Sequence, residues 1–309
     1  MTDSVFESTG QCLTSSYNVY GVSNQTITLR NNRFHCGSRD VYLYCRHCYG
    51  MSVTLHQNIF EDTNFHTAVD LSLPNVPLIQ VTENIFVNMS GRALSLSLAA
   101  NRDPENYSVV ISDNVFRSVG RQLLESVVSV YCISGFSRHV LNVSLTRNEF
   151  YFNLASTTLL TSCAGLFVTE NTFLNPDATH DYKVRVQYQD VATMFAPLNY
   201  WNASTFDEIA DRIYDHEDDE RFASVQVSPW YLDVNRTQTA SGEHKFFKGP
   251  FEIGGEVESN ITLSSTEQPY RVTQNIVVPL GRSLIIEAGV TLLFTDGGIT
   301  VEGECASEC

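Results

Sequence analysis

The octapeptide Val109-Val110-Ile111-Ser112-Asp113-Asn114-Val115-Phe116 decides the fold, because five other segments of the chain repeat its pattern. In each copy, aliphatic residues stand five and three positions before an Asn, and a Phe stands two positions after it. The repeated residues are Asn32 and Phe34, Asn58 and Phe60, Asn84 and Phe86, Asn114 and Phe116, Asn148 and Phe150, and Asn171 and Phe173. Self-similarity of this kind is the signature of a repeat architecture.

The repeat Asn residues are 26, 26, 30, 34 and 23 residues apart, and further alternating stretches such as residues 93–98 lie between them. Alternation of apolar and polar residues predicts strands with one buried face. No long helical period separates these strands, so the intervals predict stacked coils of two or three short strands each and exclude βαβ units. The chain is therefore expected to be all-β, a right-handed parallel β-helix.

The repeat Asn suits the corner that follows a strand, because Asn tolerates the left-handed backbone conformation and bonds its own backbone. The Phe that follows is expected to point inward. Coils spaced by about 4.8 Å would then stack the Asn and Phe residues into continuous columns. These columns are expected to be structural. A further, partial copy of the pattern runs from Ser4 to Phe6, 28 residues before Asn32.

The pattern loosens after Phe173. Residues 206–213 carry apolar side chains at helical spacing behind a candidate N-cap at Ser204 or Thr205, which predicts a helix of about ten residues. Residues 1–232 are thus expected to form the β-helix, with 196–232 as its capping segment. Residues 233–248 resemble a linker, and the alternating stretches of 249–309 predict the start of a second β-helix-like unit.

Composition restricts the environment and the partners. The chain has 19 Lys and Arg residues against 35 Asp and Glu residues, a net charge of −16, which argues against binding to nucleic acid or to an anionic membrane surface. There is neither a signal-peptide pattern nor an 18-residue apolar run. Targeting and anchoring segments are therefore expected outside this chain.

Seven N-glycosylation sequons favour the secretory pathway. Their acceptors are Asn24, Asn88, Asn106, Asn142, Asn202, Asn235 and Asn260. Eight cysteines agree with an oxidising compartment. Cys132 and Cys163 lie 18 and 15 residues after their repeat Asn, so neighbouring coils would bring them within bridging range.

The remaining cysteines are disulfide candidates whose pairing stays open. They are Cys12, Cys36, Cys45 and Cys48 in the first coils, and Cys305 and Cys309 at the end of the chain. The alternative is a zinc site built from His35, Cys36, Cys45, His47 and Cys48. No second Cys-x-x-Cys follows, so disulfides are favoured.

A β-helix also suits carbohydrate binding and polysaccharide lyases or hydrolases, so these are the alternative function. Such catalysis needs converging carboxylates. The candidates are Glu83, Asp113 and Glu170, each directly before a repeat Asn, and Arg147 would neutralise them. No catalytic residue and no cofactor is therefore expected. The acidic run 215–220 could ligate calcium, although its spacing differs from an EF-hand loop and a solvated turn is the usual meaning.

Most of the chain carries a family resemblance. The order of β-helix coils, Asn199-Tyr200-Trp201, the short helix, Ser228-Pro229-Trp230 and a restarting unit at Pro269 resembles the ectodomain of the bark beetle (Anakonda) family. That family consists of large single-span membrane proteins that organise tricellular junctions in insect epithelia. The resemblance implies an adhesion scaffold on the extracellular side of the plasma membrane, with protein partners at cell junctions, including homophilic ones.

Overall fold

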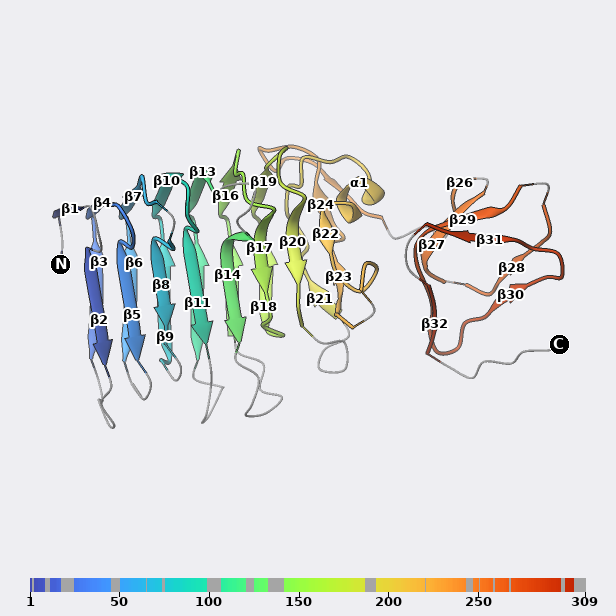
Figure 1. Ribbon diagram of the computed structural model, residues 1–309, viewed down its shortest axis with the longest axis horizontal. Coiled ribbons are helices and arrows are strands. Elements are labelled where there is room, and N and C mark those ends of the chain that lie inside the picture. Colours follow the sequence, from blue (N-terminus) through green and yellow to red (C-terminus); the bar gives the residue numbers. More distant parts are fainter. Residues whose placement is uncertain are drawn as a thin grey trace.

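The computed structural model shows an all-β chain with several parallel sheets. It describes residues 1, 3–8, 12–17, 25–45, 51–64, 66–73, 76–98, 107–120, 125–132, 142–186, 193–219, 221–242, 247–249, 251–257, 259–266, 268–295 and 298–302. Three of the sheets are long and run side by side through the first 214 residues. In Figure 1 their strands follow one another along the longest axis of the molecule.

The three long sheets are named I, II and III here. Sheet I contains β1 (Val5–Ser8), β4 (Arg33–Cys36), β7 (Ile59–Glu61), β10 (Ile85–Met89), β13 (Val115–Val119), β16 (Glu149–Tyr151) and β19 (Thr172–Leu174). Sheet II contains β2 (Leu13–Tyr17), β5 (Val41–Cys45), β8 (Val69–Ser72), β11 (Leu94–Leu98), β14 (Ser126–Cys132), β17 (Thr157–Thr161), β20 (His180–Val184) and β22 (Ile213–Tyr214). Sheet III contains β3 (Thr26–Arg30), β6 (Ser52–His56), β9 (Leu78–Thr82), β12 (Ser108–Ser112), β15 (Asn142–Thr146) and β18 (Leu166–Thr169).

Each repeat supplies one strand to each long sheet in turn. The aliphatic strand of the repeat joins sheet III, the strand that begins after the repeat Asn joins sheet I, and the next alternating stretch joins sheet II. Equivalent residues of successive repeats pair directly, as Phe86 does with Phe116. This arrangement is consistent with the β-helix-like solenoid that the repeat predicts.

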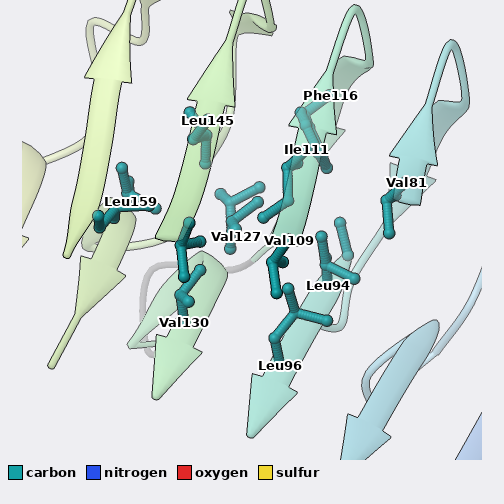
Figure 2. Close-up of a cluster of buried hydrophobic side chains, with 14 of the residues drawn as sticks. Val81, Leu94, Leu96, Val109, Ile111, Phe116, Val127, Val130, Leu145 and Leu159 are labelled. Atoms are coloured by element: carbon teal, nitrogen blue, oxygen red, sulfur yellow. The ribbon is translucent and has the colours of Figure 1, made fainter. Parts of the chain in front are cut away.

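The core lies between the three sheets and is filled by alternate residues of every strand. Figure 2 shows Val109 and Ile111 of sheet III, Phe116 of sheet I and Val130 of sheet II gathered in this space. The repeat Phe residues stack face to face from Phe6 to Phe173, and Trp201 continues the column with ring centroids 4.6 Å from Phe173. The Phe residues of the six full repeats are fully buried, whereas Phe6 is half-buried.

The helix α1 (Phe206–Ala210) has five residues, half the expected length. Thr205 is its N-cap and forms a capping box with Glu208, so the start of the helix follows from local sequence. The helix ends early because Ile213 pairs with Tyr182 as part of β22. The apolar residue at position 213 therefore reaches the core from a strand, a contact that the helical spacing did not indicate.

The segment expected as a linker, 233–248, is folded in its first part. β24 (Trp230–Tyr231) and β25 (Thr239–Ala240) form an antiparallel hairpin. The Asp233 carboxylate organises the turn by accepting the main-chain N–H groups of Thr237 and Gln238. Tyr231 pairs in parallel with Tyr200, which pairs with Thr172, so the hairpin lies at the end of sheet I. The short pair of β21 (Thr193–Phe195) and β23 (Ser224–Gln226) completes this region.

The residues after 246 form a second β unit with its own apolar core. Its strands are β26 (Phe247–Gly249), β27 (Glu252–Glu256), β28 (Ile261–Leu263), β29 (Tyr270–Val278), β30 (Leu284–Ile286), β31 (Leu292–Phe294) and β32 (Ile299–Val301). Parallel pairs join β27, β31 and β32 to β29 and β28 to β30, whereas β26 is antiparallel to β27. The buried residues Ile253, Val272 and Ile276 belong to a cluster separate from the core of the three long sheets.

Candidate functional site

The repeat Asn residues are buried and form one continuous hydrogen-bonded column. The main-chain N–H of Asn58 donates to Oδ1 of Asn84 at 2.9 Å, and Nδ2 of Asn58 donates to the same oxygen and to the carbonyl of Leu29. Equivalent bonds link Asn32, Asn58, Asn84, Asn114, Asn148, Asn171 and Asn199 in succession. Because the side-chain amides are used inside the fold, the column has a structural role.

The left-handed corner belongs to the residue before each repeat Asn. Glu83 and Asp113 have φ angles of 55° and 58°. The same conformation occurs at Asn31, Gln57, Arg147 and Glu170. The expectation that the Asn itself adopts this conformation is therefore wrong. Asn suits this position because its buried side-chain amide forms hydrogen bonds with the backbone of the same corner and of the neighbouring coils.

A second amide column was not recognised from the sequence. The main-chain N–H of Val119 donates to Oδ1 of Asn153 at 2.9 Å, and that of Asn153 donates to Oδ1 of Asn175 at 3.1 Å. Asn175 in turn donates to the buried carboxylate of Asp181, which also pairs with Arg212. The available signal was an Asn three residues after Phe150 and two after Phe173, but its spacing differs between the two coils.

The carboxylates proposed for catalysis lie on the outside of the Asn corner, in one row. Arg147 makes two bonds to Asp113, at 2.7 and 2.8 Å, and lies 3.8 Å from Glu170. These bonds hold the pKa of Asp113 below its usual value. Gln57 donates to Glu83 at 2.8 Å. The row is thus a surface series of ion pairs and hydrogen bonds.

The structure joins Cys132 to Cys163 with a Cα–Cα distance of 4.8 Å, and Cys12 to Cys36 with a Cα–Cα distance of 6.0 Å. Cys45 is disulfide-bonded as well. Because Cys36 and Cys45 are in disulfides, they have no thiolate to offer a zinc ion, which argues against the zinc site. Cys48, His47, Cys305 and Cys309 lie outside the described residues.

A buried carboxyl accompanies the first disulfide. Asp40 is fully buried, and its ligand atom lies within 4.8 Å of the sulfur atoms of Cys12 and Cys36. Burial raises the pKa of Asp40 to about 7, although a hydrogen bond from Thr63 opposes the shift. The two sulfur atoms are in a disulfide and are unsuited to binding a metal ion as thiolates.

Residues 215–219 of the acidic run form a tight, self-bonded turn. Asp215 is buried and accepts the main-chain N–H groups of Glu217 and Val225, and Asp218 accepts that of Asp215. Asp219 pairs with the guanidinium of Arg221. In the described part of the chain, these residues form no group of three acidic ligands close enough to share one ion. Glu220 lies outside that part.

The sequons that the structure describes have exposed acceptors. These are Asn88, Asn142, Asn202, Asn235 and Asn260. They lie in sheet I, in sheet III, near α1, in the β24–β25 hairpin and in the second unit respectively. Asn24 and Asn106 lie outside the described residues.

The fold and these sites define a class: an all-β chain of stacked parallel sheets, stapled by disulfides that fit an oxidising extracellular environment. In the described ranges, no helix has the length and hydropathy needed to cross a membrane. Comparison with protein-family models, with curated proteins and with solved structures finds no match.

Proposed function

We propose that this chain is a right-handed parallel β-helix that serves as a rigid extracellular adhesion scaffold. The observation that carries the proposal is the Asn column, which links seven successive levels of the stack without interruption from Asn32 to Asn199. A solenoid bonded at every level is stiff and presents long lateral faces to partners. Right-handed crossovers are strongly preferred between parallel strands, which supports the proposed handedness.

Two further observations support an extracellular place. Disulfides join successive coils at Cys12–Cys36 and at Cys132–Cys163. Each described sequon presents an exposed Asn, as oligosaccharide attachment requires. Both features fit a chain that folds in the secretory pathway.

The proposed setting is the ectodomain of a membrane-anchored cell-junction protein at tricellular contacts. Support comes from the resemblance to the bark beetle family, carried by Asn199-Tyr200-Trp201, Ser228-Pro229-Trp230 and the restarting unit. Membrane anchoring would come from segments outside this chain. The exposed carboxylates of the Asn corner are ion-paired or hydrogen-bonded, which favours a scaffold over a polysaccharide-degrading enzyme.

The test is to tag the full-length protein in the epithelium of its source organism and to delete residues 1–242. The tagged protein is expected at vertices where three cells meet, and the deletion is expected to abolish this enrichment while the protein still reaches the surface. Uniform staining along two-cell contacts would contradict the junction role. If the purified chain cleaved a polyuronide and a Glu83→Gln, Asp113→Asn variant did not, the result would support an enzymatic function and contradict the scaffold proposal.

A further inference from the structure

The outward face of sheet I carries two rows of side chains, because alternate residues of each strand point away from the core. The register of the sheet fixes which residues are neighbours in each row. The first row is Arg33, Ile59, Ile85, Val115 and Glu149. The second row is His35, Glu61, Val87, Arg117 and Tyr151.

The centre of this face is an apolar patch. Ile85 is 41% exposed, and its neighbours Ile59, Val87 and Val115 are half-buried. Phe152, at the adjoining corner, is 51% exposed and has a φ of 51°. Asp62, Asn88 and Ser118, which also stand two residues after a repeat Phe, have the same conformation, so the φ of Phe152 is a repeated corner of the fold and only its exposure bears on binding. An apolar group of this kind on a solvent-facing sheet indicates an interaction site.

The charges around the patch are arranged so that the face complements itself. Along the first row the signs read positive at Arg33, neutral three times, and negative at Glu149. In the second row Glu61 is negative and Arg117 is positive, one level to either side of Val87. Turning a second copy over about an axis along β10 reverses the order of the levels. Arg33 then opposes Glu149, and Glu61 opposes Arg117, each across the interface.

We propose that the outward face of sheet I is a self-association site, at which two copies of this chain pack face to face about a two-fold axis along β10. Ile85 lies on the axis, and the apolar residues of the two copies meet in the centre. The contact needs only this chain and can be tested on the purified protein. Its meaning as a homophilic contact between scaffolds rests on the proposed function.

The charge pattern also selects the orientation of the axis. A two-fold axis along the direction of stacking would place Ile59 against Glu61 and Val115 against Arg117, since each level would face itself. Glu61, which pairs with Arg33 of its own copy, and Arg117 would then be desolvated against apolar side chains, with no opposite charge on the other copy. The axis along β10 avoids this and is the arrangement proposed. At the far end, Arg236 of the hairpin donates to Thr172 and bounds the face.

The size of the face predicts a weak dimer. Five adjacent strands at about 4.8 Å span roughly 19 Å, and the two rows are roughly 7 Å apart along the strands, so each copy would bury far less than the roughly 800 Å² that a standard interface takes from each partner. We therefore expect a dissociation constant on the order of 100 μM, a range in which several chains on one surface would act together. Asn88 follows Val87 at the rim, where a glycan would stand between the copies. The contact is therefore proposed for the form of the chain that carries no glycan at Asn88, and all proteins for the test carry Asn88→Gln.

The first test compares two apolar-to-lysine variants of similarly exposed residues by sedimentation equilibrium of the whole chain. Ile85→Lys places two lysines against each other on the axis and is expected to weaken the dimer at least tenfold. Phe167→Lys, on sheet III, changes a residue that is 45% exposed away from the proposed contact and is expected to leave the dimer unchanged. Equal effects of the two variants would overturn the proposal. A parent protein that stays monomeric at roughly 500 μM would also overturn the proposal.

The second test uses the charges. Arg117→Glu places like charges at both copies of the Glu61–Arg117 contact, and Glu61→Arg does the same with the opposite sign, so each variant alone is expected to be monomeric. An equimolar mixture of the two restores both contacts in a mixed dimer. A change that acted only through folding would not produce this rescue, and a mixture that stays monomeric would contradict the proposed axis. Neither result bears on where the full-length protein lies in a cell, so this proposal and the scaffold role fail separately.

Discussion

The side chain of each repeat Asn forms hydrogen bonds with main-chain and amide groups of neighbouring coils. Asn114 shows this: its Oδ1 accepts the N–H and Nδ2 of Asn84, and its Nδ2 donates to Val81 and to Asn148. Buried polar groups that lose such partners cost about 1–3 kcal/mol each. Position 114 is therefore expected to tolerate few other residues.

Asn114→Ala is expected to lower the free energy of unfolding by about 3 kcal/mol, because Asn84 N–H and the carbonyl of Val81 lose buried partners. Urea denaturation measures the effect. The matched control is Asp113→Asn, since Asn keeps the left-handed corner and loses only an exposed ion pair worth about 0–1 kcal/mol. Similar losses in the two variants would show that the amide column is not the stabilising feature.

The buried carboxyl of Asp40 predicts a dependence of stability on pH. Because burial raises the pKa of Asp40 to about 7 from the ordinary value of 3.8, the folded state binds the proton more tightly than the unfolded state. Its contribution is fully present below pH 3.8 and is lost as the pH rises towards 7, by up to about 1.4 kcal/mol per pH unit. Asp215, whose pKa burial also raises to about 7, adds to the same trend.

Asp40→Asn keeps an acceptor for Thr63 and cannot titrate, so the free energy of unfolding should fall less steeply between pH 4 and pH 7 than in the parent protein. Urea titrations across that range give the slope. Asp215→Asn should remove a separate share of it. An unchanged slope in the double variant would mean that neither carboxyl is protonated in the folded state.

At the scale of the elements, the Phe column binds successive strands of sheet I together. Phe116 lies between Phe86 and Phe150, with ring centroids 4.8 Å away on each side, whereas among the described residues Phe6 stacks on Phe34 alone. Removing a fully buried Phe leaves a cavity and costs about 3–5 kcal/mol. The cost should therefore depend on the position in the column.

Phe116→Ala is expected to lower the free energy of unfolding by about 3–5 kcal/mol, and Phe6→Ala by less than half as much, because Phe6 is half-buried. Chemical denaturation of both variants provides the comparison. Equal losses would contradict the inference that stacking on both faces sets the stability of each level.

At the scale of the whole molecule, the described residues form two apolar cores that share no residue. The second core is far smaller than the first, and Ile253, Leu263 and Ile276 belong to it. Units with separate cores unfold separately when few contacts couple them. The smaller core should melt at the lower temperature.

Differential scanning calorimetry is therefore expected to show two transitions. Ile276→Ala should lower only the first transition temperature and Phe116→Ala only the second, because each residue is buried in one core. One cooperative transition that both variants shift would show that the two units fold as a single body.

The sequence by itself determined the repeat, the strands and the residues that line the core. Period-2 alternation before each Asn is a local signal, and it sufficed because the strand before each Asn buries one face. The same regularity placed Cys132 and Cys163 on neighbouring coils, where they form a disulfide. It also placed Glu83, Asp113 and Arg147 in one outward row, where Arg147 pairs with Asp113.

Only the tertiary structure decided the features that depend on contacts between distant residues. The helix stops at Ala210 because Ile213 pairs with Tyr182, and residues 233–240 fold because Trp230 and Tyr231 find strand partners. The left-handed residue precedes the Asn because the buried amide must reach the next coil. Such choices follow from the neighbours that a residue meets after folding, and a pattern along the chain does not contain them.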